Sequence, residues 1–105
     1  MYIQIVTFNL YGMTDAEYRQ LCEEAASVVA AQPGLISKVF LANRETNTYG
    51  GVYTWRDREA MVAYTESEFF KAFAATPTLA NAGMQAFGVL DGPTRVTHGL
   101  LEAVV

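Results

Sequence analysis

The sequence predicts an α+β fold of the ferredoxin-like type, with the order β-α-β-β-α-β and a four-stranded antiparallel sheet that carries its helices on one face. Segments rich in β-branched and aromatic residues alternate with amphipathic segments in that order along the 105 residues. The second predicted strand has apolar residues on both faces, which is typical of a strand covered twice. The length suits one hydrophobic core, so we expect a single domain over residues 1–105.

The first strand and the first helix are predicted within residues 2–34. Residues 2–8, "YIQIVTF", are β-branched and aromatic with a rough alternation, which favours a strand. Thr14 followed by Glu17 is the capping-box pattern that begins a helix. The helix then presents an apolar stripe made of Tyr18, Leu21, Cys22, Ala25 and Val29. Proline and glycine in "QPG", residues 32–34, end the helix.

Two strands are predicted after the first helix. Residues 35–43, "LISKVFLAN", form the second strand, with Val39 on one face and Phe40 on the other. Residues 44–49 are polar and typical of a turn. The third strand is "GGVYTW", residues 50–55, whose glycine pair indicates a bulge or a close approach of two backbones.

The C-terminal third is predicted to hold the second helix and the fourth strand. Asp57 is a suitable N-cap for the helix, which we expect to bend or restart near Ser67. Residues 76–83, "TPTLANAG", favour a loop or a short helical turn, and residues 84–91, "MQAFGVLD", favour the fourth strand. The stretch 100–105 is largely apolar, which predicts a tail that packs against another surface.

The two apolar faces of the second strand also predict a partner subunit. Helices on one side of the sheet leave the other side bare, and apolar residues there favour a second layer. A homodimer in which two sheets pack face to face about a two-fold axis covers both bare faces with one interface. The hydrophobic fraction of 51% is high for so short a chain and fits such an interface.

Composition argues against several classes of partner. The formal net charge is −4, with seven basic and eleven acidic residues and no basic cluster, so nucleic acid is not an expected partner. No apolar run is long enough to span a membrane and no signal peptide is recognised, so no membrane partner is expected. The lone Cys22 cannot form an internal disulfide, which is typical of a cytoplasmic protein; on its apolar stripe we expect it to be buried and inert.

Neither a metal site nor a cofactor site is predicted. A metal site needs three or four clustered nitrogen, sulfur or oxygen ligands, whereas the chain has one histidine, His98, and one cysteine. The glycine pair does not lead into a helix, so it is not a nucleotide-binding motif. No Gly-x-Ser-x-Gly sequence is present to place a serine nucleophile.

An aromatic group with polar tips is the main candidate for a site. On the third strand Tyr53 and Trp55 are predicted on one face, and Tyr64 lies about 10 Å along the following helix, which runs back over the sheet. We therefore expect a cleft lined by Tyr53, Trp55, Met61, Tyr64 and Phe69, which suits a flat aromatic ligand. The alternative is that these residues are ordinary core, with their polar atoms bonded to backbone or water.

Three polar residues are weaker candidates. Asn9, just past the first strand, is either a turn residue or a donor to a ligand carbonyl. Lys38 lies in the middle of the second strand and either extends to the sheet edge or holds an anion. His98 titrates near neutrality and is a candidate base, although a surface position is favoured for it.

The middle third of the chain resembles a known family. Residues 32–64 combine Pro-Gly, Lys-Val-Phe, Gly-Gly-Val-Tyr, an aromatic residue, and an Asp before a helix that carries Ala-Tyr. This pattern is similar to the YdhR-type mono-oxygenases of the dimeric α/β-barrel superfamily. The residues that carry it are Pro33, Gly34, Lys38, Val39, Phe40, Gly50, Gly51, Val52, Tyr53, Trp55, Asp57, Ala63 and Tyr64. More distantly, residues 55–73 resemble a segment of antibiotic-biosynthesis monooxygenases, many of which have a histidine where this chain has Tyr64.

The resemblance implies a ferredoxin-like dimer whose two sheets form a barrel. It also implies cofactor-independent oxygenation, with O2, of a small aromatic substrate such as a phenol, a quinol or a polyketide-like anthrone. Trp55 and Tyr64 would then orient the substrate and stabilise its anion. Asn9 and Lys38 would be further substrate contacts. Two other functions stay open: a non-catalytic small-molecule-binding or stress-response module, and an isomerase or cyclase with His98 or a tyrosine as acid or base.

Overall fold

The computed structural model describes residues 1–100, which form a four-stranded sheet with helices packed on it. The strands are β1 (Tyr2–Leu10), β2 (Leu35–Asn43), β3 (Thr48–Trp55) and β4 (Leu79–Gly88). The helices are α1 (Asp15–Ala30), α2 (Arg58–Thr65), α3 (Glu68–Ala74) and α4 (Asp91–Val96). Neighbouring strands are antiparallel in the order β2-β3-β1-β4. This confirms the predicted α+β, ferredoxin-like class.

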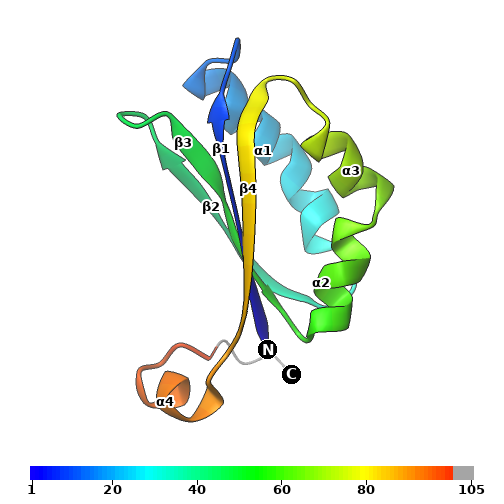
Figure 1. Cartoon of the computed structure of the whole chain (residues 1–105), viewed down its shortest axis with the longest axis vertical. Coiled ribbons are helices and arrows are strands. Elements are labelled where there is room, and N and C mark those ends of the chain that lie inside the picture. Colours follow the sequence, from blue (N-terminus) through cyan, green and yellow to red (C-terminus); the bar gives the residue numbers. More distant parts are fainter. Residues whose placement is uncertain (101–105) are drawn as a thin grey trace.

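The helices are distributed unevenly around the sheet. Helices α1, α2 and α3 lie on one side of it and leave the other side open, as Figure 1 shows. In the same view α4 lies beyond the end of β4, away from the other three helices. The core therefore lies between one helical layer and one face of the sheet.

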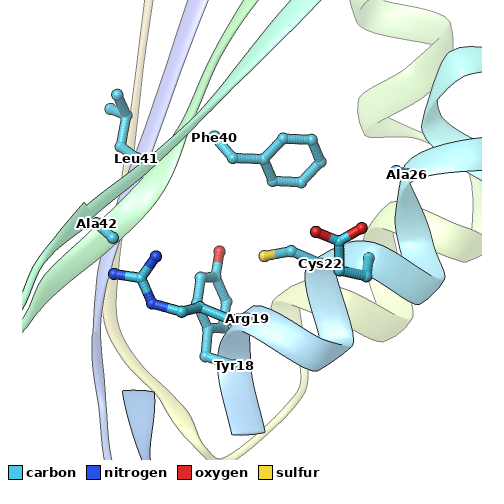
Figure 2. Close-up of a pocket in the computed structure, with 8 residues that line it drawn as sticks. Tyr18, Arg19, Cys22, Ala26, Phe40, Leu41 and Ala42 are labelled. Atoms are coloured by element: carbon cyan, nitrogen blue, oxygen red, sulfur yellow. The ribbon is translucent and has the colours of Figure 1, made fainter. Parts of the chain in front are cut away.

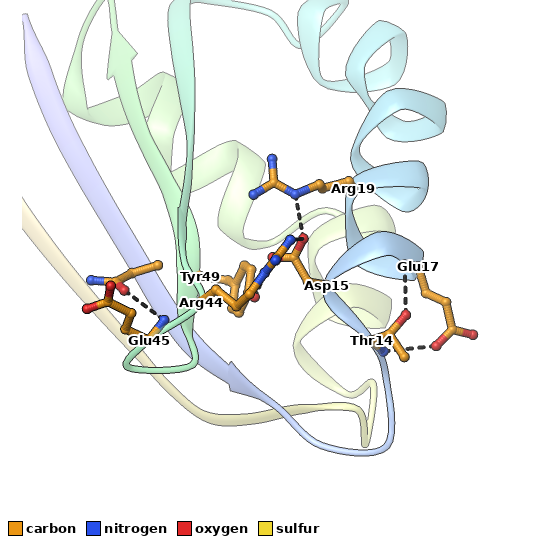
Figure 3. Close-up of polar contacts among 8 residues, drawn as sticks. Thr14, Asp15, Glu17, Arg19, Arg44, Glu45 and Tyr49 are labelled. Carbon is orange, nitrogen blue, oxygen red and sulfur yellow. Dashed lines mark hydrogen bonds and ion pairs between the residues drawn. The ribbon is translucent and has the colours of Figure 1, made fainter.

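Side-chain caps set the helix starts where the sequence predicts them. The Thr14 hydroxyl accepts a hydrogen bond from the Glu17 amide at 3.1 Å, and the Glu17 carboxylate accepts one from the Thr14 amide at 2.9 Å (Figure 3). Asp57 caps α2 by accepting from a backbone amide of its first turn. The restart near Ser67 is confirmed, because the Ser67 hydroxyl accepts from the Phe70 amide and caps α3.

The fourth strand differs most from the prediction. It spans Leu79–Gly88 rather than residues 84–91, so its first half replaces a predicted loop. β1 continues to Leu10, beyond its predicted end, through an irregularity of register between Thr7 and Asn9. This extension of β1 pairs with the first residues of β4. Backbone pairing across the sheet thus outweighs the weak strand preference of residues 79–83.

The chain after β4 forms a helix that the sequence did not predict. Gly92 and Pro93 lie in the first turn of α4, where proline is tolerated. The predicted packing of the apolar tail concerns residues 101–105, which lie outside the described residues. Across residues 1–100 no helix is both long enough and apolar enough to cross a membrane.

The register assigns strand residues to the two faces of the sheet. Tyr53 pairs with Lys38 of β2 and Gln4 of β1, and this face meets the helices, because the Tyr53 hydroxyl contacts the hydroxyl of Tyr64 on α2. The open face carries an apolar row made of Ile3, Ile5, Val39, Val52 and Phe87. Any side chain at Gly50 would collide with the carbonyl oxygen of Val6 on β1, as predicted for a close approach of two backbones.

Candidate functional site

A cavity of about 370 Å³ lies between the helix-covered face of the sheet and helices α1 and α3. The size suits a small ring system. Its walls are mainly apolar and aromatic. Lys38, Tyr53 and Tyr64 line it together with Phe69 and Phe73 of α3. The structure therefore brings four of the candidate residues together around one cavity: Lys38, Tyr53, Tyr64 and Phe69.

The apolar stripe of α1 forms the opposite wall. All five of its residues, Tyr18, Leu21, Cys22, Ala25 and Val29, line the cavity. The sequence identifies this stripe as a buried face but gives no reason to place it at a site. The small side chains of Cys22 and Ala25 are the available signal, because they leave space between α1 and the sheet. Cys22 is half-buried rather than buried, and its predicted inert core position is corrected to a position on the cavity wall.

Two tyrosines supply hydrogen-bond donors to the cavity. The hydroxyl oxygens of Tyr53 on β3 and Tyr64 on α2 are 3.3 Å apart. Burial raises the pKa of both phenols, and for Tyr64 the hydrogen bond with Tyr53 partly opposes that rise in pKa. Both phenols therefore stay protonated at neutral pH and can donate to an oxygen of a ligand.

Lys38 adds a positive charge to the same wall. Its Nζ atom lies 4.0 Å from the centre of the Phe40 ring and 4.6 Å from the centre of the Tyr53 ring, within cation–π range. Burial lowers the pKa of Lys38 from 10.5 to about 8. At neutral pH the amine is therefore mostly protonated, but it loses its proton more readily than an exposed lysine.

Trp55 and Met61 lie behind the cavity. The Trp55 side chain is fully buried, and its Nε1 atom donates a hydrogen bond of 3.0 Å to Oε1 of Gln4. The indole ring packs against the rings of Tyr53 and Tyr64, with centroids 5.9 and 5.0 Å away. Met61 is also buried in this layer. The prediction that Trp55 and Met61 line the cleft is therefore wrong, because both pack in the layer of core behind its wall.

Asn9 and His98 lie away from the cavity. The Asn9 side chain donates to the Asn47 carbonyl at 2.7 Å and accepts from the Asn81 amide at 3.0 Å, so it joins the β2–β3 loop to the start of β4. The expectation of a ligand contact for Asn9 is thus corrected to a structural role between loops. His98 is exposed after α4, as the surface alternative predicts, and it is not placed to act as acid or base in the cavity.

A second hollow, of about 320 Å³, lies on the outer side between α1 and β2. Figure 2 shows the Phe40 ring and the Cys22 thiol projecting into the space between these two elements, with the Tyr18 hydroxyl beside them. Tyr18, Cys22 and Phe40 line both this outer groove and the inner cavity. These three side chains therefore separate the cavity from the groove.

A polar cluster at the start of α1 fixes one end of this arrangement (Figure 3). Asp15 accepts from the Tyr49 hydroxyl at 2.6 Å, from Arg19 at 2.6 Å and from Arg44 at 3.1 Å. The hydrogen bond from Arg19, followed by those from Tyr49 and Arg44, holds the pKa of the Asp15 carboxyl well below its usual range. The cluster ties α1 to the hairpin of β2 and β3, and so it positions the two walls of the outer groove.

Several solved structures share the fold of this chain. SnoaB, a cofactor-independent oxygenase from Streptomyces nogalater, superposes with a TM-score of 0.66 at 22% identity, over 84% of this chain and 92% of that chain. A "putative antibiotic biosynthesis monooxygenase" from Deinococcus radiodurans gives a TM-score of 0.73 at 17% identity, over 88% and 95%. The haem degrader MhuD from Mycobacterium tuberculosis gives 0.68 at 20% identity, over 86% and 96%.

Sequence comparison is more specific than these structural likenesses. No curated protein sequence matches the chain. The family described as "Putative mono-oxygenase ydhR" matches residues 3–100, which include the whole lining of the cavity and all residues of the described strands and helices except Tyr2 at the start of β1. The chain therefore belongs to the ydhR mono-oxygenase family.

Proposed function

We propose that the protein oxidises a small aromatic substrate, such as a phenol, a quinol or a polyketide-like anthrone, with O2 and without a bound cofactor. The observation that carries this proposal is the cavity of about 370 Å³, whose mainly apolar walls include the paired hydroxyls of Tyr53 and Tyr64 and the ammonium group of Lys38. Membership of a mono-oxygenase family supports the class of reaction. The cofactor-independent oxygenase SnoaB, which shares the fold, supports the mode of reaction.

The reaction balances with O2 as the only oxidant. The deprotonated substrate gives one electron to O2, and the resulting substrate radical and superoxide combine to form a C–O–O bond. After protonation, the O–O bond breaks, and the same carbon loses its remaining hydrogen. One oxygen atom stays in the product as a carbonyl and the other leaves as water. The substrate itself supplies the electrons, so the protein has to bind the aromatic ring, stabilise its anion and exclude water.

The cavity residues suit these three tasks. The hydroxyls of Tyr53 and Tyr64 donate to the substrate oxygen on which negative charge accumulates, and their geometry is fixed before the substrate binds. Phe69 and the α1 stripe pack on the flat ring and keep water away. Trp55 acts as a positioning residue, because its buried indole packs against both tyrosine rings from behind. Met61 supports the same layer.

A homodimer is part of the proposal. Val39 and Phe87, which lie on the edge strands β2 and β4 and belong to the apolar row of the open sheet face, are 56% and 49% exposed. A second copy of the chain, packed sheet to sheet about a two-fold axis, would cover the apolar row that contains them. The uncharged, apolar character of the row favours a like surface over a charged partner.

Oxygen consumption tests the proposed reaction. Wild-type protein, incubated with a panel of hydroquinones and anthrones, is expected to consume one O2 per substrate and to place one 18O atom from 18O2 in the product. Tyr64→Phe removes one donor to the developing anion, and we expect kcat to fall by about 100-fold. Tyr49→Phe is the matched control, since the Tyr49 hydroxyl bonds Asp15 outside the cavity. Uptake no faster than the uncatalysed rate across the panel would refute the proposal.

A further inference from the structure

We propose that the cavity selects aromatic ligands that carry an anionic group, either a carboxylate or an ionised phenol. The ammonium group of Lys38, whose side chain packs over Gly51, binds that anionic group. The inference names the substrate class of the proposed function, and it rests on that function only in taking the cavity as the substrate site. Because it concerns binding, it can be tested without turnover.

Lys38 has no counter-ion in the described part of the chain. Both ion pairs found among residues 1–100 belong to Asp15, the first residue of α1. No acidic side chain lines the cavity within these residues, and Lys38 is the one charged group on its wall. A partly buried ammonium without a carboxylate partner is costly. An anionic ligand would supply the missing partner, whereas a cationic ligand would be repelled.

Aromatic faces hold the ammonium in place. The centres of the Phe40 and Tyr53 rings lie 4.0 and 4.6 Å from Nζ. These contacts stabilise the cation through the ring quadrupoles but leave its N–H groups without the charged acceptor that they prefer. A carboxylate in the cavity would accept strong, charge-assisted hydrogen bonds from Nζ, while its aromatic ring would occupy the apolar part.

Gly51 leaves free the space that the side chain of Lys38 occupies. A Cβ atom at Gly51 would lie 2.6 Å from Cε and 3.5 Å from Nζ of Lys38. The Lys38 side chain therefore lies across the space that any other residue at position 51 would fill. This gives the two glycines of the pair different roles: Gly50 allows the close approach of β1, and Gly51 is a positioning residue for the ammonium.

Among the titratable groups on the cavity wall, Lys38 determines how the charge of the cavity changes with pH. Tyr18, Tyr53, Tyr64 and Cys22 share the cavity with it. Burial raises the pKa of all three tyrosines, so they remain neutral in the range where Lys38 loses its proton. The binding measurements are made in a Cys22→Ser background, so that the Cys22 thiol cannot contribute to the change in charge with pH. Affinity for an anion should then fall as pH rises through the titration of Lys38.

Calorimetric titration with two probes of nearly equal shape tests the proposal. 2-Naphthoate carries the anionic group and 2-naphthamide lacks it. We expect the Cys22→Ser protein with Lys38 intact to bind the naphthoate about 10- to 100-fold more tightly than the amide at about pH 7, and to lose this preference at about pH 10. Lys38→Met should abolish the preference while it keeps the affinity for the amide, which reports an intact cavity. Lys38→Arg should retain the preference.

Variants at matched positions distinguish an effect at the Lys38 site from a general effect on the protein. Lys71→Met removes the exposed lysine of α3 and should change neither affinity. Gly51→Ala should weaken naphthoate binding, whereas Gly83→Ala should not, because an added Cβ there meets no atom closer than 4.0 Å. As a measurement on the wild-type sequence, the NMR signal of 13C-methylated Lys38 should shift with naphthoate and not with naphthamide.

Each outcome of these measurements either supports the inference or overturns it. Equal binding of the two probes, binding of neither, a preference that survives Lys38→Met, or an unmoved Lys38 signal would overturn the inference. Failure of the oxygenation reaction would not, because a non-catalytic binder with the same cavity would still prefer the naphthoate. Conversely, oxygen uptake on neutral substrates alone would support the proposed function and contradict this substrate class.

Discussion

The Nε1 atom of Trp55 donates a 3.0 Å hydrogen bond to Oε1 of Gln4, and both side chains are fully buried. A polar pair of this kind is costly to break from either side, because the remaining partner is left in an apolar environment. The pair lies directly behind the tyrosines of the cavity. It therefore connects the stability of the core to the geometry of the proposed site.

Replacing Gln4 should destabilise the fold, because the buried indole N–H of Trp55 would lose its hydrogen-bond acceptor. We expect Gln4→Leu to lower the free energy of unfolding by about 1–3 kcal/mol. Trp55→Phe should also destabilise, but the double variant should lose less than the sum of the two, since no buried donor or acceptor of the pair remains. Urea unfolding followed by circular dichroism measures all three. Strict additivity would show that the hydrogen bond contributes nothing.

Lys38 should make stability depend on pH with a defined sign. Its pKa is about 8 in the folded chain and 10.5 when unperturbed, so between these values the unfolded state binds more protons and stability rises with pH. We therefore expect Lys38→Met to be more stable than the wild type at about pH 7, and this advantage to shrink by about pH 10. The difference isolates Lys38 from the tyrosines that titrate above it. A constant difference, or one matched by Lys71→Met, would contradict the assignment.

Asp15 should also make stability rise with pH, but in the acidic range and as a group that stabilises the fold at neutral pH. Its pKa is held below the usual 3.8 by Arg19, Tyr49 and Arg44, so its contribution is present above that value and is lost as pH falls towards the folded-state pKa. Asp15→Asn should be less stable than the wild type at neutral pH, and the two unfolding curves should converge well below pH 3.8. The exposed Glu45, replaced by Gln, serves as the control. Curves that remain apart in acid would argue against the cluster.

The open sheet face should control the oligomeric state. We expect the wild type to sediment as a dimer and Val39→Lys to sediment as a monomer with an unchanged circular dichroism spectrum, because Val39 is already 56% exposed in the single chain. Val28→Lys, at an exposed apolar position on α1, is the matched control and should remain dimeric. A monomeric wild type at micromolar concentration, or a Val39→Lys dimer, would refute the proposed interface.

The sequence was sufficient for the fold and for part of the cavity. Capping signals at Thr14 and Asp57 located helix starts, and alternation on the third strand placed Tyr53 and Trp55 on one face. The start of β4 at Leu79 could not be read locally, because it depends on pairing with β1 across the sheet. Trp55 was wrongly predicted to line the cavity for a related reason. Strand alternation shows on which face of the sheet a side chain lies, but not whether that side chain reaches the cavity or packs in the core behind the cavity wall.

The boundary between the inner cavity and the outer groove consists of the side chains of Tyr18, Cys22 and Phe40 rather than of backbone. Phe40 belongs to β2, the edge strand of the sheet, and its ring is 37% exposed. Passage of a small ring system across this partition would involve rotation of these side chains rather than the breaking of strand pairs, and side-chain rotation is the faster of the two motions. Release of a product by this route would not limit the rate of turnover.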